Sequence, residues 1–222
     1  LSLFRNLGDG TFEPAQELLS DLPPIGLTYS QMWTDVDNDG YPDWFVPATT
    51  GPLLLLNVSD GAGGRRLADA TAESGFTLLG PAPMGIAAGD YDNDGDFDIA
   101  VSDAADGTYY ENRSGFMTLV SPFGTAFAWG VTWLDADNDG DLDHYQCGRY
   151  GTTRFDSLIR NLGDGTWEDV STVLNGVNAA SQHTVQIDFN NDGRQDLITL
   201  NPGFPDTIIS VLENISTTEG HW

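Results

Sequence analysis

Apolar residues along this chain come in short runs separated by polar turns. Residues 44–46, 99–101, 145–147 and 197–199 are four such runs, and each follows an acidic segment. Short apolar runs bounded by Gly, Asp and Asn are typical of β-strands. No segment combines the 3.6-residue apolar spacing of an amphipathic helix with capping residues. The pattern therefore predicts a chain that is nearly all β.

The strand-like runs belong to a repeat that occurs four times. Each copy contains a nine-residue acidic segment, at 35–43, 90–98, 135–143 and 188–196, so successive copies start 55, 45 and 53 residues apart. In the second copy we expect strands at 84–89, 97–102, 108–112 and 116–120. The acidic loop would join the first strand to the second, and a turn of the Asp-Gly class would join the third to the fourth. One four-stranded sheet per repeat is the pattern of a β-propeller blade.

The repeats predict a β-propeller, or a propeller segment, of about four to five four-stranded antiparallel blades. We place it at residues 1–215, with a partial blade at 1–20, repeats at about 21–75, 76–121, 122–175 and 176–215, and a tail at 216–222. Segments 3–6, 158–161 and 211–214 align with one another as third strands. Two alternatives follow: the chain is part of a larger ring, or it is an open arc whose edge strands pair with further copies.

The chain is strongly acidic. It has 34 Asp and Glu residues against eight basic residues, all Arg, and a formal net charge of −26. Such a chain has no basic patch for nucleic acid or for an anionic membrane surface. No apolar run reaches the ~18 residues of a membrane span. The single cysteine, Cys147, excludes an intrachain disulfide, and we expect it to be a buried, unreactive thiol.

The four acidic segments hold 17 of the 34 acids and have the composition of cation-binding loops. Side-chain oxygens recur at positions 1, 3, 5 and 9, position 7 offers its carbonyl, and Gly at position 6 allows a sharp turn. Ca²⁺ takes six to eight oxygen ligands, whereas Mg²⁺ is less apt because it keeps several waters. We therefore expect about four Ca²⁺ ions. The predicted ligands are Asp35, Asp37, Asp39, Tyr41 and Asp43; Asp90, Asp92, Asp94, Asp96 and Asp98; Asp135, Asp137, Asp139, Asp141 and Asp143; and Asp188, Asn190, Asp192, Arg194 and Asp196.

These loops are not EF-hands. An EF-hand has a bidentate Glu at position 12 and flanking helices, whereas position 12 here is Val, Val, Gln and Thr, and strand-like residues follow. Acidic turns without metal are the weaker alternative, because clustered carboxylates repel one another. The fourth loop has Asn190 and Arg194 where the pattern has acids, which predicts a weaker site. Asp9 and Asp164, each in an Arg-Asn-Leu-Gly-Asp-Gly-Thr segment, are expected to be turn residues.

The acidic segments, together with RNLGDGTFE, LADATAESGF and MGIAAGDYDNDGDFDIAV, resemble the integrin-type FG-GAP/VCBS repeat. Within this family of calcium-loop β-propellers they look most like the cartilage-acidic-protein and ASPIC/UnbV branch. The resemblance covers essentially residues 1–215. It implies Ca²⁺ at positions 1, 3, 5, 7 and 9 of each loop. It also implies a secreted or cell-surface protein used for adhesion, recognition or glycan contact.

No GxSxG, HExxH, Walker or GxGxxG pattern occurs in the chain. We therefore expect a binding or assembly module, whose partner is an extracellular protein, a glycan or further copies of the chain. One alternative is a structural subunit of an extracellular filament or surface layer, built by edge-strand pairing. The other is a calcium-dependent polysaccharide lyase or hydrolase.

Three further groups of residues are candidates for contact with other molecules. The densest basic and aromatic patch consists of His144, Arg149, Tyr150 and Arg154. Three tryptophans are expected to fill the core between blades, with sugar stacking as the alternative: Trp33, Trp129 and Trp133. Three N-glycosylation sequons lie where third strands should end at the surface, with a simple turn role as the alternative: Asn57, Asn112 and Asn214.

Overall fold

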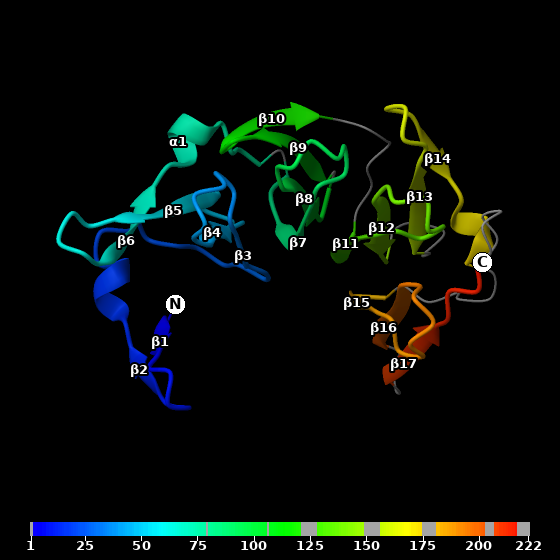
Figure 1. The fold of residues 1–222 in the computed structure, drawn as a ribbon, viewed down its shortest axis with the longest axis horizontal. Coiled ribbons are helices and arrows are strands. Elements are labelled where there is room, and N and C mark those ends of the chain that lie inside the picture. The colour runs from blue at the N-terminus through cyan, green and yellow to red at the C-terminus, as the bar shows by residue number, and fades with distance from the viewer. Residues whose placement is uncertain are drawn as a thin grey trace.

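The computed structural model describes residues 2–78, 80–105, 107–120, 128–148, 156–174, 181–202 and 207–216. Within them the chain forms five antiparallel sheets (Figure 1), which confirms the predicted all-β, propeller-like fold class. The helices of this part of the chain are single turns: η1 (Gln16–Leu19), α1 (Thr71–Ser74) and η2 (Ser171–Val173). None of the helices in the described part is long and apolar enough to cross a membrane.

Four of the sheets are blades whose strands pair in chain order. Blade 1 contains β3 (Met32–Thr34), β4 (Asp43–Val46), β5 (Leu53–Ser59) and β6 (Arg65–Asp69). Blade 2 contains β7 (Pro83–Gly89), β8 (Asp98–Asp103), β9 (Thr108–Arg113) and β10 (Phe116–Val120). Blade 3 contains β11 (Gly130–Leu134), β12 (Asp143–Cys147), β13 (Ser157–Asn161) and β14 (Trp167–Asp169). Blade 4 contains β15 (His183–Ile187), β16 (Asp196–Pro202) and β17 (Thr207–Leu212).

The fifth sheet is an N-terminal hairpin of β1 (Phe4–Asn6) and β2 (Phe12–Pro14). Its strands correspond to the third and fourth strands of a blade, because the same Asn-Leu-Gly-Asp-Gly-Thr turn joins β13 to β14. In blade 2, all four predicted strands are present. In each of the four blades the acidic loop joins the first strand to the second, as predicted.

The sheets follow one another around an arc that is open between β1–β2 and β15–β17 (Figure 1). Each blade therefore has a preceding face, turned toward the blade before it, and a following face, turned toward the blade after it. Strand alternation divides the side chains between the two faces. On β4, for example, Phe45 packs in a core with blade 2, whereas Trp44 and Val46 pack against residues of the segment that contains η1.

Apolar cores lie at the boundaries between blades. The boundary of blades 1 and 2 contains Phe76, whose ring makes edge contacts with Phe45 and Tyr110 at centroid distances of 5.2 Å. At the boundary of blades 2 and 3, Trp133 stacks on Tyr91 at 5.6 Å. A third core joins blades 3 and 4 and includes the buried free thiol of Cys147. Burial also raises the pKa of this thiol to about 12, because the thiolate is poorly solvated there.

A buried asparagine links each blade to the loop of the blade before it. In blades 2, 3 and 4, an Asn lies within two residues of the end of the third strand. Its Nδ2 donates to the carbonyl of loop position 2 in the preceding blade. The pairs are Asn112 with Val36 at 2.9 Å, Asn161 with Tyr91 at 2.8 Å, and Asn214 with Ala136 at 3.0 Å. Two of these residues, Asn112 and Asn214, were expected at exposed strand ends; both are fully buried. Asn57 of blade 1 is half-buried.

Candidate metal centres and a candidate ligand groove

Three of the acidic loops bring carboxylates together. In each of these loops, three side chains offer oxygens that all lie within 4.8 Å of one another. The groups are Asp35, Asp37 and Asp39; Asp90, Asp92 and Asp94; and Asp135, Asp137 and Asp143. This donor set, oxygen-only and densely acidic, fits a hard divalent cation such as Ca²⁺.

Backbone N–H groups hold the carboxylates in place. In the first loop, Gly40 N–H donates to Asp35 at 2.8 Å and Tyr41 N–H donates to Asp39 at 2.9 Å. The position-6 glycine has a left-handed φ in all four loops, between 86° and 97°, as the sharp turn requires. The position-4 asparagine is left-handed as well, with φ near 60° at Asn38 and its three counterparts. Asn tolerates this conformation better than most residues.

The position-9 aspartate braces each loop. In the second loop, Asp98 accepts from the N–H of Tyr91 at 3.0 Å and from the N–H of Asn112 at 2.9 Å. Asp43, Asp143 and Asp196 accept from the corresponding two N–H groups. Burial raises the pKa of both Asp98 and Asp143 to about 7, since a buried carboxylate loses hydration. A bound cation would offset this desolvation.

The fourth loop differs from the other three. Asn190 Nδ2 donates to Asp192 at 2.9 Å and to Glu213 at 3.1 Å, so its amide is directed at acids. The Arg194 guanidinium forms an ion pair with the position-5 carboxylate of Asp192 and donates to the Asn214 carbonyl at 2.6 Å. The Arg194 guanidinium therefore binds the Asp192 carboxylate, which the loop pattern assigns to a metal ion.

Arginines also contact two of the other loops. Arg65 lies 3.1 Å from the position-5 carboxylate of Asp39 and stacks over the ring of Tyr41, at 3.5 Å from its centroid. In the third loop, Arg160 lies 3.5 Å from Asp137. No arginine ion pair is recorded for a second-loop carboxylate within the described residues; Arg113 pairs instead with Glu111.

Of the predicted basic and aromatic patch, only His144 lies within the described residues, and it is not at the surface. The His144 side chain is fully buried in β12, between the rings of Tyr109 and Trp133, each with its centroid 5.0 Å away. The burial of His144 was not evident from the sequence, because a His in a strand can point to either face of the sheet. Arg149, Tyr150 and Arg154 lie outside the described residues.

The other singled-out residues are distributed as follows. Trp133 is buried, whereas Trp33 is 42% exposed and stacks on Trp44 at 5.2 Å. Asp9 accepts from the N–H and hydroxyl of the Thr two residues later, and Asp164 does the same. Both acids are therefore turn residues, as expected. These hydrogen bonds lower the pKa of each carboxyl.

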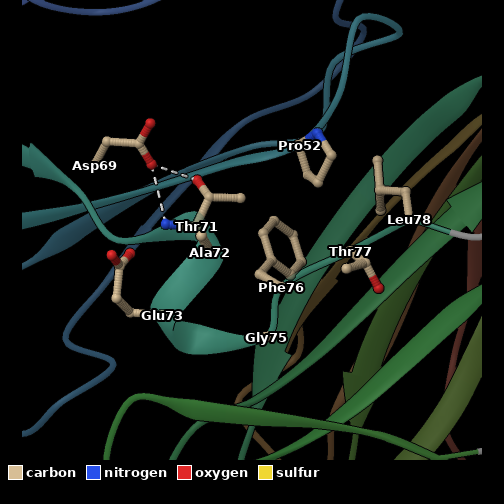
Figure 2. A pocket seen from close by; sticks show the side chains of 9 residues that line it. All are labelled: Pro52, Asp69, Thr71, Ala72, Glu73, Gly75, Phe76, Thr77 and Leu78. Atoms are coloured by element: carbon tan, nitrogen blue, oxygen red, sulfur yellow. Dashed lines mark hydrogen bonds between the residues drawn. The ribbon is translucent and has the colours of Figure 1, made fainter.

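A cavity of about 600 Å³ lies beside α1, lined by residues of blade 1 and of the segment that leads to blade 2 (Figure 2). We call it the α1 groove. Its lining residues are Pro52, Asp69, Thr71, Ala72, Glu73, Gly75, Phe76, Thr77 and Leu78. The groove is not evident in the sequence, because its walls come from a strand-to-strand turn, a single-turn helix and an interblade linker. Most of the lining residues lie in the segment LADATAESGF, which was noted in the sequence only for its resemblance to the repeat family.

The α1 groove combines acceptor groups with an apolar wall. Asp69 Oδ1 accepts from the Thr71 N–H at 3.0 Å and hydroxyl at 2.6 Å, which fixes that carboxylate (Figure 2). The side chain of Glu73 is exposed, and Pro52 and Leu78 lie toward the other wall. None of the nine lining residues is basic. Such a groove favours neutral, hydroxyl-bearing ligands over anions.

The fold and its acidic loops define a propeller-like repeat protein. A model of the FG-GAP-like repeat matches residues 35–101 and 90–145, which together are half of the chain. The chain therefore belongs to the FG-GAP-like repeat family. Its place in a particular branch of that family stays a prediction. No curated protein is significantly similar to it in sequence.

A solved structure shares the fold. It is that of an Agrocybe aegerita lectin, described as the structural basis of specific recognition of non-reducing terminal N-acetylglucosamine. The TM-score is 0.56 at 16% sequence identity, and the similarity covers 98% of this chain. This chain spans 58% of the lectin chain. At this level of identity the similarity shows a shared fold.

Proposed function

We propose that this protein is a calcium-stabilised extracellular recognition module that binds a neutral glycan in the α1 groove. The observation that carries the proposal is the groove itself, in which Asp69, Glu73 and hydroxyl groups face an apolar wall without a basic side chain. Sugar hydroxyls donate well to carboxylates, and sugar C–H faces pack against apolar side chains. The lectin with the same fold supports a glycan as the ligand class.

Calcium has a structural role in this proposal. The clustered carboxylates of loops one to three would repel one another without a cation, and a ligand that binds only the folded state stabilises it by mass action. At a hundredfold excess over its Kd, each ion would add up to about 2.7 kcal/mol. Chelation with EDTA should therefore lower the melting temperature by tens of degrees. An unchanged melting temperature would contradict this role.

Glycan binding is tested by titration calorimetry with neutral, amino and acidic saccharides, with calcium present throughout. We expect a neutral saccharide to bind, Glu73→Ala to weaken it, and Glu17→Ala to leave it unchanged. Glu17 is a matched control because it is an exposed acid on η1, far in sequence from the groove. Preferential binding of acidic saccharides, or equal loss in both variants, would contradict the proposal.

An assembly role and a polysaccharide lyase activity are the competing functions. Assembly rests on the open arc and on sheet edges that can pair between chains (Figure 1). Lyase activity has less support, because His144, a member of the predicted basic and aromatic patch, is buried. Incubation with acidic polysaccharides, followed by absorbance of the unsaturated product, separates an enzyme from a binding module.

A further inference from the structure

The boundaries between blades are built from three recurring contacts. The first is the buried Asn of the third strand, described above. The second runs the other way: the position-4 asparagine of one loop donates to the next blade. Asn93 Nδ2 donates to Asp141 at 2.7 Å, Asn38 donates to Asp96, and Asn138 donates to the Ser216 hydroxyl at 2.9 Å. The third contact is the apolar packing of the following face against the next blade.

Blade 4 has the same following face, and within the described part of the chain no further blade packs on it. Val211 on β17 pairs with Ile198 on β16. The residues at the same place in the third strands of blades 1, 2 and 3 are Leu54, Tyr109 and Leu158. Those three side chains are buried, whereas Val211 is 52% exposed. Three more apolar residues of this blade are exposed beside it: Val185, Leu200 and Ile209. They line a shallow apolar cavity with His183 and Ile198.

The polar contacts of this boundary are open as well. Phe189 is the position-2 residue of loop four, and among the described residues no asparagine amide is recorded on its carbonyl. Its side chain is 48% exposed, whereas its equivalents Val36 and Ala136 are buried. No partner is recorded there for the position-4 amide of Asn191 either. All three recurring contacts are therefore vacant on one surface.

The N-terminal hairpin carries the complementary surface. Asn6 occupies the third-strand position of Asn161, as the shared hairpin register shows. Its Oδ1 accepts from Gly8 N–H at 2.8 Å, as Asn161 Oδ1 does from Gly163, and no acceptor is recorded for its Nδ2 within the described chain. Phe4, two residues earlier, is 57% exposed, whereas its counterparts Tyr110 and Ile159 are buried. The hairpin thus offers the amide and the apolar side chain of a preceding face.

We propose that the following face of blade 4 docks the N-terminal hairpin of a second copy of this chain, head to tail. Asn6 of that copy would donate to the Phe189 carbonyl, and its Phe4 would cover Val211. A second copy fits because both complementary surfaces occur on this chain, while one molecule holds them on opposite sides of the opening of its arc (Figure 1). Face-to-face docking of this kind differs from edge-strand pairing, and it does not depend on ligand binding in the α1 groove. Such a heterologous contact generates rings or filaments.

Sedimentation velocity with calcium and physiological salt, which screens the net charge of −26, tests the proposal. We expect concentration-dependent oligomers, and we expect Val211→Asp to weaken association about tenfold or more. Ile215→Asp is the matched control: Ile215 is exposed, and so are its repeat equivalents Leu7 and Leu162, so no boundary buries this position. A monomer at all concentrations, or equal effects of the two variants, would overturn the proposal.

A cross-linking experiment identifies the docked surfaces even if Val211→Asp fails to fold. Two proteins are mixed, one with Asn6→Cys and one with Phe189→Cys, and treated with a short thiol cross-linker. Both positions are exposed, and the natural Cys147 is buried. Head-to-tail docking predicts cross-links between the two proteins and few within either kind. Products dominated by like-with-like pairs would overturn it.

Discussion

At the scale of single residues, the third-strand asparagines decide how the blades join. Asn112 is fully buried, and each polar group of its side chain is used: Nδ2 donates to Val36 and Oδ1 accepts from the Gly115 N–H at 2.9 Å. Its backbone N–H holds Asp98 of its own loop. One residue thus connects a strand, its own acidic loop and the loop of the preceding blade.

Asn112→Asp tests this role with almost no change in shape. The new carboxylate would face the Val36 carbonyl without a donor, and a buried unsatisfied polar group costs about 1–3 kcal/mol, or more when charged. We therefore expect the free energy of unfolding in urea to fall by at least that amount. Asn57→Asp is the control, because Asn57 Nδ2 reaches only the Pro42 carbonyl of its own blade, at 3.2 Å. Equal losses in the two variants would mean that the interblade bond is unimportant.

The buried imidazole of His144 makes stability depend on pH. Burial lowers its pKa to about 3, because a charged ring is poorly solvated between Tyr109 and Trp133. Below its ordinary pKa of 6.5, the unfolded chain binds a proton that the folded chain excludes. The contribution of this residue to the free energy of unfolding therefore falls as pH drops from 6.5 toward 3, by at most about 1.4 kcal/mol per pH unit.

His144→Phe should raise the free energy of unfolding at pH 5, relative to its value at pH 6.5, compared with the natural chain. The raised pKa of Asp98 and Asp143 acts in the opposite sense but is common to both chains. Urea unfolding at several pH values measures the slope. His183→Phe is the control, since the exposed imidazole on β15 is not enclosed by rings. Parallel slopes for His144→Phe and the natural chain would show that this histidine does not link protonation to folding.

At the scale of elements, the four loops share a backbone but differ in the cations that the protein itself supplies. In loop four, the hydrogen bond from the Arg194 N–H lowers the pKa of the Asp192 carboxyl, and the ion pair with the Arg194 guanidinium adds to this effect. Loop two has no such pair among the described residues. The loops should therefore differ in affinity for Ca²⁺, with loop four the weakest.

Arg194→Gln should strengthen the weakest site. The variant keeps the backbone carbonyl of position 7 as a ligand, and it removes the guanidinium that competes with Ca²⁺ for Asp192. An exposed ion pair is worth up to about 1 kcal/mol, so the gain should be about two- to fivefold in affinity. Calcium titration calorimetry resolves this weakest phase. Arg113→Gln, which removes a guanidinium paired with Glu111 and not with a loop carboxylate, should leave it unchanged.

Elements were predictable where their signals are local. Each acidic segment contains its own turn residues, and the next few residues alternate between faces, so the strands around 84–120 follow from sequence alone. The role of Asn112 was missed because its acceptor, Val36, is 76 residues away in the chain. The available signal was that an Asn recurs near the end of the third strand of each blade. It was interpreted as sequons and turns, which are also local explanations.

The site was predictable to a similar extent. Convergence of Asp90, Asp92 and Asp94 follows from their spacing in one loop. The α1 groove was not predictable, because Pro52, Glu73 and Leu78 meet only after two blades pack around Phe76. The orientation of His144 depends on which face of β12 turns toward blade 2. Strand periodicity fixes the alternation of faces but not which face is which.

At the scale of the whole molecule, stability is distributed along the arc. Each blade contacts mainly its neighbours, so a blade with two covered faces should open less readily than a blade with one. Blade 3 is covered on both sides by cores that include Trp133 and Tyr145. Among the described residues, blade 4 is covered on its preceding face alone, through residues such as Leu197.

Amide hydrogen exchange should therefore be graded from blade 3 to blade 4. We expect the β15–β16 ladder to exchange at least about tenfold faster than the equivalent β11–β12 ladder, because local opening of blade 4 exposes less additional apolar surface. The comparison is matched, since both ladders join a first strand to a second strand across an acidic loop. Mass spectrometry at low protein concentration measures the free chain.

Raising the protein concentration should slow exchange selectively in β15–β17 if a second copy covers Val211. Uniform protection in both ladders at low concentration would instead mean that blade 4 is stable with one face open, and that its exposed apolar residues do not weaken it.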